Sequence, residues 1–336
     1  MNKNWLITGG CGFIGRNLIA YLLKNYADIN IRVLDNLSVG SKDDLGSVCD
    51  FKMEEIDNVS APFKGVVLVQ GDIRNPQDCF NSAKGIDTVV HLAANTGVQP
   101  SMDNPRLDLE SNVLGVFNML EAARQHKVHK FIFASSGAPL GEVTPPINEE
   151  IVAKPISPYG ASKLAGEAYC QVYGKSFGLK TVVFRFGNVY GPRSGHKASI
   201  VAKFFKNAYN KMPLEIYGDG NQTRDFVYVE DLLEAFILAD KADVAGEIFQ
   251  IATYRETTVN EIANLIKKIL KEHEGIDVEI IHTQERVGDM KRNFSDISKA
   301  RRILGFEPRH DIAQGLLKTY SFFKSRHANH EATRIS

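Results

Sequence analysis

Hydrophobic positions follow two alternating patterns along the first half of the chain. Short, nearly continuous apolar runs predict buried strands, and they alternate with stretches in which apolar residues recur every three or four positions, as in helices. The strands are expected at 4–8, 31–35, 66–72, 87–94, 130–136 and 180–186, and the helices at 13–23, 107–126 and 158–177. Apolar, β-branched strands alternating with helices predict an α/β fold, a doubly wound parallel sheet covered on both faces.

The pattern changes after residue 187. Loops rich in Gly, Pro and Arg alternate with short helical stretches at about 198–210, 257–272 and 311–324. We therefore expect one domain at 1–187, followed by a smaller and irregular α+β lobe at 188–325, with some chain crossing back between the two. The polar residues 326–336 are expected to fray.

Composition narrows the class of protein. The 336 residues carry 40 Lys and Arg against 40 Asp and Glu, a balance that argues against a nucleic-acid or membrane-surface partner. Apolar runs are too short to span a membrane, and the N-terminal residues lack the pattern of a signal peptide. The four cysteines have neither metal-site nor disulfide spacing, so we expect reduced thiols, no metal and a cytoplasmic location.

A glycine-rich segment joins the first predicted strand to the first predicted helix. Gly9, Gly12 and Gly15 have the spacing that allows a tight turn, contact between a pyrophosphate and the backbone, and close helix packing. Asp35 ends the second strand about 20 residues later, where an acid binds the ribose hydroxyls of NAD and repels the 2′-phosphate of NADP. These residues predict an NAD site.

Asp72, at the end of the third predicted strand, has two interpretations. It could accept a hydrogen bond from the adenine amino group, or it could be the N-cap of the following helix.

Candidate catalytic residues lie at the start of a predicted helix and at the end of a predicted strand. Tyr159 and Lys163 are four residues apart at the start of a predicted helix and so share a face, although an ordinary surface pair would have the same spacing. The lysine ammonium should lower the pKa of the phenol, so that Tyr159 can take a proton from a substrate hydroxyl. Ser136 closes its strand and could assist, or it could be a turn serine.

The chain resembles the extended short-chain dehydrogenase/reductase family, the NAD-dependent nucleotide-sugar epimerases and dehydratases. The resemblance runs through nine segments in order: TGGCGFIG, LDNLSVG, GDIR, HLAA, NVLGVFNMLEAAR (which begins at Asn112), SPYGASK, GNVYGPR, GDGNQTRDFVYVED and ERVGDMKR. It implies a Rossmann-type NAD domain and, by analogy with the family, a homodimer formed through the helices that hold Asn112 and Tyr159.

The resemblance also implies a role for each matching residue. For the cofactor these are Gly9, Gly12, Phe13, Ile14 and Gly15 at the pyrophosphate, Asp35, Asn36 and Ser38 at the adenosine ribose and nearby phosphate, Asp72 and Ile73 at adenine, Leu92, Ala93 and Ala94 toward the nicotinamide ribose, and Lys163 at that ribose. Tyr159 would be the base, assisted by Ser136. For the nucleotide diphosphate of the sugar they are Asn188, Arg224, Arg286 and Asp289, with Tyr217 near the base.

Two small residues after Ser136 indicate the reaction. Family dehydratases have an Asp-Glu pair there and decarboxylases have a Glu, whereas this chain has Gly137 and Ala138. The resemblance therefore implies epimerisation at C4 of a UDP-sugar through a 4-keto intermediate, with NAD retained and regenerated in each turnover. The sugar could be a hexose, an N-acetylhexosamine or a uronic acid. The alternatives are a 4-keto reductase, a UDP-glucuronate decarboxylase, an epimerase at another carbon, or a non-catalytic NAD-binding protein.

Overall fold

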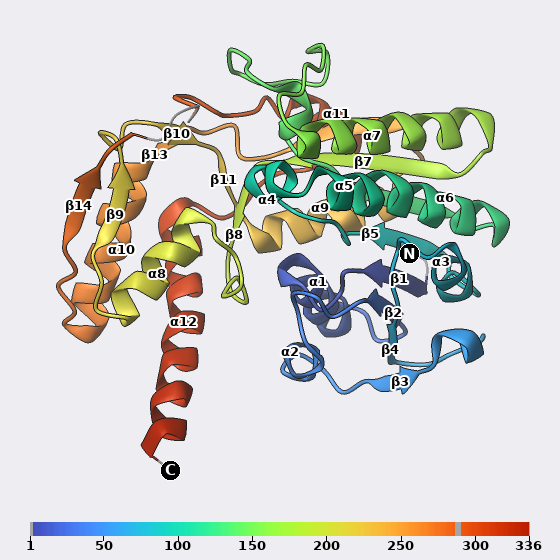
Figure 1. The fold of residues 1–336 in the computed structure, drawn as a ribbon, viewed down its shortest axis with the longest axis horizontal. Helices are drawn as coiled ribbons and strands as arrows, with labels where there is room; N and C mark the ends of the chain where they lie inside the picture. The colour runs from blue at the N-terminus through green and yellow to red at the C-terminus, as the bar shows by residue number, and fades with distance from the viewer. Residues whose placement is uncertain (1–2, 286–289, 336) are drawn as a thin grey trace.

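An eight-stranded sheet forms the centre of the molecule, and every neighbouring pair of its strands is parallel (Figure 1). The computed structural model describes residues 3–285 and 290–335. The strand order is β12-β7-β6-β5-β1-β2-β4-β3. The strands are β1 (Asn4–Thr8), β2 (Asn30–Asp35), β3 (Lys52–Glu54), β4 (Val66–Gln70), β5 (Thr88–His91), β6 (Lys130–Ala134), β7 (Lys180–Phe186) and β12 (Glu247–Ile251). The predicted doubly wound parallel sheet is confirmed.

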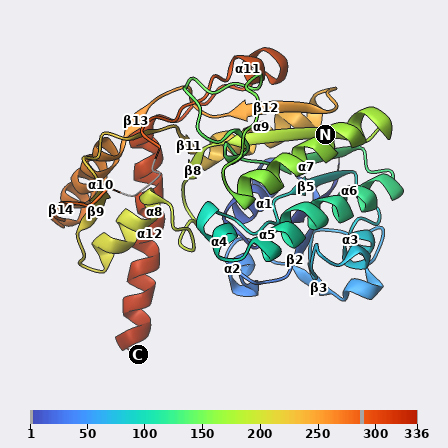
Figure 2. The same ribbon diagram turned by 45° about the horizontal axis from the view of Figure 1, so that its top comes forward.

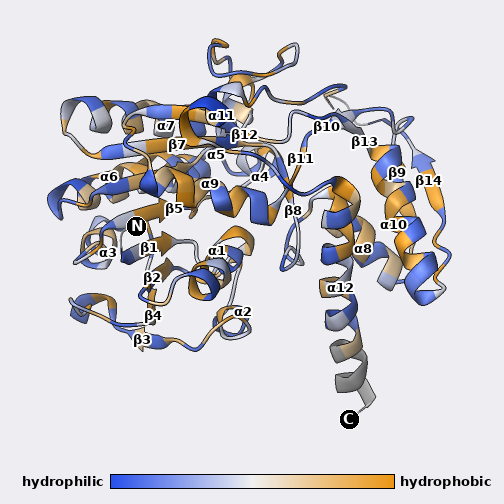
Figure 3. Cartoon of the chain, turned by 180° about the vertical axis from the view of Figure 1, so that it is seen from behind, coloured by the Kyte–Doolittle hydropathy of each residue, from blue (hydrophilic) through white to orange (hydrophobic). Residues whose placement is uncertain are grey.

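Two hydrophobic cores lie on opposite faces of this sheet. Successive residues of a strand point to opposite faces, so Trp5 and Ile7 enter one core and Leu6 the other. Figure 3 shows the hydrophobic residues concentrated along these central strands. Helices α1 and α9 pack in the first core, and α3, α6 and α7 pack in the second.

The helices are α1 (Phe13–Asn25), α2 (Lys42–Gly46), α3 (Pro76–Ser82), α4 (Val98–Asp103), α5 (Pro105–Leu109), α6 (Gly115–Gln125), α7 (Pro158–Ser176), α8 (Ile200–Tyr209), α9 (Val229–Lys241), α10 (Val259–Glu274), α11 (Ser298–Leu304) and α12 (Ile312–Ile335). Short 3₁₀ turns span Ile56–Asn58 and Ala138–Leu140. A π-helical turn, Glu110–Leu114, joins α5 to α6, so the helix expected at 107–126 contains an extra residue in one turn. Helix α12 extends beyond the expected 311–324.

The remaining strands form three small pairs beside the main sheet. They are β8 (Asn188–Tyr190) with β11 (Phe226–Tyr228), β9 (Leu214–Tyr217) with β14 (Ile280–Thr283), and β10 (Thr223–Arg224) with β13 (Thr257–Thr258). Figures 1 and 2 show β9, β14, α8 and α10 grouped away from the large sheet, with α12 running past them. In the described ranges, no helix combines the length and hydrophobicity that a membrane span requires.

Elements from the second half of the chain return to the first lobe, among them α9 and β12, and α11 packs on both of these. Helix α9 packs against α1 and β6, and β12 adds to the edge of the sheet by pairing with β7 in parallel. The first core continues from the sheet into the second lobe, because it also contains residues such as Phe205, Leu214 and Ile262. The two lobes are therefore joined by shared packing as well as by the chain.

Candidate active site

The glycine-rich segment forms a tight turn against the end of β5. Gly9 has φ +69°, and a Cβ there would lie 2.9 Å from the backbone nitrogen of Ala93. A Cβ on Gly15 would lie 2.5 Å from the Cα of Gly10. Helix α1 begins at Phe13, followed by Ile14. Its N-cap, Gly12, has no side chain to cap the helix, so the first N–H groups of the helix receive no hydrogen bond from a capping side chain. A pyrophosphate fits such a turn and helix N-terminus.

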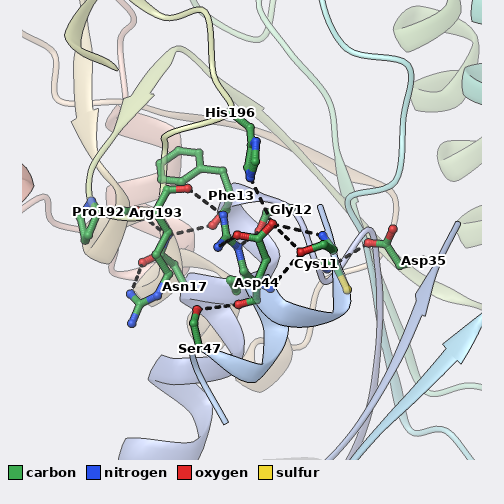
Figure 4. Close-up of polar contacts among 12 residues, drawn as sticks. Cys11, Gly12, Phe13, Asn17, Asp35, Asp44, Ser47, Pro192, Arg193 and His196 are labelled. Atoms are coloured by element: carbon green, nitrogen blue, oxygen red, sulfur yellow. Dashed lines mark hydrogen bonds and ion pairs between the residues drawn. The ribbon is translucent and has the colours of Figure 1, made fainter. Parts of the chain in front are cut away.

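Asp35 lies beside this turn, next to Cys11, as Figure 4 shows. Its carboxylate accepts hydrogen bonds from the N–H groups of Cys11, at 2.9 Å, and Leu37, at 2.8 Å. Burial raises its pKa, and the two N–H donors partly oppose that rise. Asn36 accepts from the N–H of Ser38 at 3.1 Å, which orders the next part of the segment. The predicted ribose residues therefore sit together beside the glycine turn.

Asp72 lies at the mouth of a cavity of about 400 Å³, lined by Asp72, Arg74, Asn75, Glu110 and Leu114. Its carboxylate accepts from Arg74 Nη2 at 2.7 Å and from Asn36 Nδ2 at 3.2 Å, and the bond from Arg74 lowers its pKa to about 2. The N-cap of α3 is Asn75, so Asp72 is not the cap that the alternative interpretation suggested. Ile73, the next residue along the chain, is buried.

The residues that follow β5 lie against the end of β1, next to the glycine turn. The N–H of Leu92 donates to Thr8 O at 3.2 Å, and that of Ala93 donates to Thr8 Oγ1 at 3.1 Å. Leu92, Ala93 and Ala94 therefore lie at the carboxyl edge of the sheet, where ligands bind in open parallel sheets.

The three candidate catalytic residues meet at the same edge. Ser157 caps α7 by accepting from the N–H of Gly160 at 3.1 Å, and Pro158 fits the first helical position. This start places Tyr159 within hydrogen-bonding reach of Ser136 and places Lys163 Nζ 5.8 Å from the Tyr159 ring centroid. The ammonium of Lys163 donates to Ala134 O, at the end of β6, at 2.8 Å. The surface-pair alternative is therefore wrong for Lys163, which is buried.

Burial dominates the ionisation of this pair. It raises the pKa of Tyr159 to about 12, and the bond with Ser136 only partly lowers it. Burial also lowers the pKa of Lys163 to about 8, against the fields of Asp108 and Glu167, which raise it. The expected lowering of the Tyr159 pKa by Lys163 is therefore not what this geometry gives, because the loss of water around the phenol has the larger effect.

A polar network that the sequence did not single out supports the catalytic helix. Asn112, in the π-helical turn, donates to Asp108 Oδ1 at 2.7 Å and to Asn95 O at 2.8 Å, and its own Oδ1 accepts from the N–H of Asn95 at 2.8 Å. It also reaches Ser162 on α7. A buried asparagine within an otherwise periodic helix was the available signal, because such groups need partners.

The residues predicted to hold the substrate diphosphate come from the second lobe. Asn188 begins β8, and its N–H donates to Asp225 O at 3.2 Å, which brings it close to Arg224 in β10. Arg224 Nη1 donates to Met290 O at 2.6 Å. Tyr217 ends β9, and its hydroxyl accepts from Lys203 Nζ at 3.1 Å. Arg286 and Asp289 lie outside the described residues.

A second polar cluster ties the two lobes together beside the glycine turn (Figure 4). Arg16 on α1 pairs with Asp44 on α2 at 2.6 Å and donates to Arg193 O at 3.0 Å. His196 Nε2 lies 3.1 Å from the other carboxylate oxygen of Asp44. Asn17 accepts from Arg193 Nη1 at 2.9 Å. The loop after β8 is thus fastened to the elements around the predicted pyrophosphate site.

Residues 5–252 match the model of the NAD dependent epimerase/dehydratase family. The chain belongs to this family. A putative UDP-glucose 4-epimerase of Methanocaldococcus jannaschii is 37% identical over 327 residues, which is 95% of this chain and 98% of that protein. The family resemblance drawn from the nine sequence segments is therefore confirmed.

Solved structures of epimerases share the whole fold of this family member. A UDP-N-acetylglucosamine 4-epimerase from Methanobrevibacter ruminantium, in complex with UDP-N-acetylmuramic acid, has a TM-score of 0.84 and 31% identity, with 97% of this chain and 99% of that chain covered. A UDP-glucuronic acid 4-epimerase from Bacillus cereus, in complex with UDP-glucuronic acid and NAD, has a TM-score of 0.82 and 29% identity, with 96% and 99% covered.

Proposed function

We propose that this protein is an NAD-dependent epimerase acting at C4 of a UDP-sugar. The observation that carries the proposal is that the glycine turn, Asp35 and the Ser136, Tyr159 and Lys163 cluster lie along one carboxyl edge of the sheet. A dinucleotide on the turn would extend toward Tyr159, and the family relatives named above act on UDP-sugars.

The catalytic residues divide the proton chemistry among them. Tyr159 takes the proton of the C4 hydroxyl, and Ser136, which shares a hydrogen bond with Tyr159, binds the same oxygen. Lys163 provides positive charge beside the phenol and a donor for the nicotinamide ribose. NAD⁺, when bound, supplies the acceptor and later the donor of the C4 hydride, and its cationic ring opposes the effect of burial on Tyr159. The proton returns from Tyr159 when the 4-keto sugar is reduced.

Inversion at C4 requires the sugar to turn first one face and then the other toward the cofactor site at the carboxyl edge of the sheet. The UDP part must therefore stay held while the sugar turns. We assign this hold to Asn188 and Arg224, with Tyr217 near the base and with Arg286 and Asp289 from the sequence pattern. Guanidinium groups suit a diphosphate because they offer several donors in a fixed plane.

The space beside Ser136 favours epimerisation over elimination. Gly137 has φ −72° and ψ −15°, which any residue can adopt, and a Cβ there would meet nothing within 4 Å. Neither Gly137 nor Ala138 provides a carboxyl group to expel a hydroxyl or direct a decarboxylation. Relatives named for UDP-glucose, UDP-N-acetylglucosamine and UDP-glucuronic acid keep a hexose, an N-acetylhexosamine and a uronic acid as candidate sugars.

We further propose a homodimer formed by the outer surfaces of α6 and α7. Leu114, Phe117, Tyr169, Val172 and Phe177 are each between 38% and 53% exposed there, and the rings of Phe117 and Tyr169 are in contact, with centroids 5.7 Å apart. A second copy of the chain would cover this apolar surface. Light scattering of the V172E variant should show a monomer where the wild type shows a dimer. We also propose a cytoplasmic location, because the four cysteines are free and reduced thiols are typical of that compartment.

One experiment tests the proposed reaction directly. Purified protein with no added cofactor is incubated with UDP-glucose, UDP-N-acetylglucosamine or UDP-glucuronate, and the products are resolved by proton NMR. We expect the 4-epimer of at least one sugar to accumulate to an equilibrium mixture. Protein that retains NAD but converts none of the three sugars would contradict the proposal. Release of CO₂ would indicate the decarboxylase alternative, and turnover that requires added NAD(P)H and releases oxidised cofactor would indicate the reductase alternative.

A further inference from the structure

A buried carboxylate on the catalytic helix joins three elements of the active site. Glu167 is 1% exposed and receives two hydrogen bonds from the guanidinium of Arg185, from Nε at 2.8 Å and from Nη2 at 2.6 Å. The hydroxyl of Ser135 donates to the same carboxylate at 2.5 Å. Glu167 belongs to α7, Ser135 follows β6, and Arg185 lies near the end of β7.

This junction lies directly behind the catalytic residues. Tyr159, Lys163 and Glu167 are spaced by four residues on α7 and so share one face of the helix. Ser135 immediately precedes Ser136, and its N–H donates to Phe184 O in β7 at 2.8 Å. The bond from Ser135 to Glu167 and the bond from Lys163 to Ala134 O therefore hold the end of β6 against the same helical face.

The stability of the fold does not by itself account for such a pair. The two ions are 4% and 2% exposed, and the removal of buried charges from water offsets much of their attraction. Apolar residues of similar size often stabilise a fold equally well. The two parallel bonds do fix the orientation of both side chains, because a bidentate guanidinium and carboxylate pair allows little rotation of either group.

We propose that Glu167 is a positioning residue, which with Arg185 and Ser135 sets the distance between the hydroxyl of Ser136 and the phenol of Tyr159. This inference rests on the proposed function for its kinetic consequence, but the spacing itself can be measured without substrate. A small displacement of a proton-transfer pair lowers the rate far more than it weakens binding, so the effect should appear in kcat.

Ser135→Ala is the first test because it removes one bond and leaves the buried ion pair in place. We expect kcat to fall about ten- to a hundredfold while KM for the UDP-sugar and retention of NAD stay unchanged. Ser82→Ala is the matched control: Ser82 is also buried and donates one bond, to Cys79 O at 2.9 Å, but it lies on α3 and away from the catalytic edge. Its kcat should equal that of the wild type.

A second variant tests the carboxylate itself. Glu167→Gln keeps the size of the side chain but removes a charge whose field raises the pKa of Lys163. The alkaline limb of the pH profile of kcat should therefore move to lower pH in this variant. A purely structural role would lower the melting temperature and leave the pH profile of the folded protein unchanged.

A measurement on the substrate-free protein separates this inference from the proposed function. In protein labelled with ¹³C at Cζ of tyrosine, the Tyr159 resonance is assigned by its loss in Tyr159→Phe. We expect this resonance to shift in Ser135→Ala and to stay in place in Ser82→Ala. An unchanged resonance in Ser135→Ala overturns the inference, whether or not kcat falls, since the spacing would not depend on the junction. Wild-type protein that converts no UDP-sugar overturns the proposed function alone, and the resonance then decides the inference.

Discussion

The ammonium of Lys163 lies 5.8 Å from the centroid of the Tyr159 ring, and its hydrogen bond goes to the carbonyl of Ala134 at 2.8 Å. Lys163 is thus held beside the Tyr159 ring by the backbone of β6. Lys163 is buried and Tyr159 is half-buried, so their ionisation depends on the balance between loss of water and nearby charge. The first two predictions follow from this arrangement.

Replacing Tyr159 by Phe should remove the proton acceptor and little else. We expect turnover to fall by about 10²- to 10⁴-fold or to vanish, while NAD stays bound, because the backbone of the glycine turn is untouched. Tyr169→Phe, on the exposed side of the same helix, is the matched control and should retain full activity. Turnover and cofactor content are measured on the same preparations. Wild-type turnover in Tyr159→Phe would remove this residue from the role of base.

Activity should decline as the pH rises through about 8. Burial lowers the pKa of Lys163 to this value, so its ammonium is present below pH 8 and is lost above it. Asp108 raises that pKa, so Asp108→Asn should move the decline to lower pH. The measurement is kcat/KM as a function of pH, with Asp103→Asn, at an exposed position on α4, as the control. An identical decline in wild type and Asp108→Asn would exclude Lys163 as its origin.

His91 should make the fold sensitive to acid. It is fully buried at the end of β5, and burial lowers its pKa from 6.5 to about 3. Between pH 6.5 and 3 the unfolded chain therefore binds more protons than the folded chain, so stability falls as the pH falls. At pH 4.5 the loss from this residue is roughly 3 kcal/mol.

The control for His91 is a variant that cannot titrate. His91→Asn should lower the free energy of unfolding at pH 7.5 but flatten its dependence on pH between 6.5 and 4.5. Urea unfolding at several pH values measures both quantities. Parallel curves for the two proteins would show that His91 does not contribute to the acid dependence.

The pair of Arg16 with Asp44 lies within the first lobe and should stabilise its contact with the loop after β8, because Arg16 donates to Arg193 O and Asp44 pairs with His196. The Arg16 side chain is only 2% exposed, so Asp44→Asn leaves a buried cation without its partner, at a cost of about 3 kcal/mol. Arg16, His196 and Ser41 lower the pKa of Asp44 in spite of the opposing effect of its burial. The contribution of the pair is therefore present above the usual aspartate pKa and is lost as the pH falls through the lowered value.

The neighbouring Asp43→Asn is the matched control, because Asp43 is exposed. We expect a lower melting temperature and faster loss of NAD on dilution for Asp44→Asn alone. Equal melting temperatures for the two variants would show that the Arg16–Asp44 pair adds nothing to the stability of the fold.

The sequence predicted the sheet well because its strands are continuous apolar runs buried on both faces. It predicted that some chain crosses back between the lobes, but it did not identify α9 and β12 as the elements that return from within the irregular half of the chain. Nor did it predict the π-helical turn, because one extra residue barely disturbs the spacing of apolar residues between Leu109 and Val116. The return of a segment to a distant sheet is decided by tertiary packing.

The candidate site was predicted as residue types at strand and helix ends. The structure places the glycine turn, Asp35 and the cluster of Ser136, Tyr159 and Lys163 at the carboxyl edge of the sheet. What the sequence could not give was burial. The pKa of Tyr159 depends on how much water the fold removes from the phenol, and the spacing of residues along the sequence does not reveal this. The supporting polar bonds were also out of reach, because Ser135 and Glu167 are 32 residues apart and Asn112 and Ser162 are 50 apart.

The return of α9 and β12 to the sheet has a consequence for any attempt to divide the protein. The chain passes from the first lobe to the second after β7, comes back at α9, leaves again after β12 and returns once more at α11, which packs on β12 and α9. The first lobe is therefore completed by segments from beyond residue 187, and a chain cut at that residue could not be expected to fold as two independent halves.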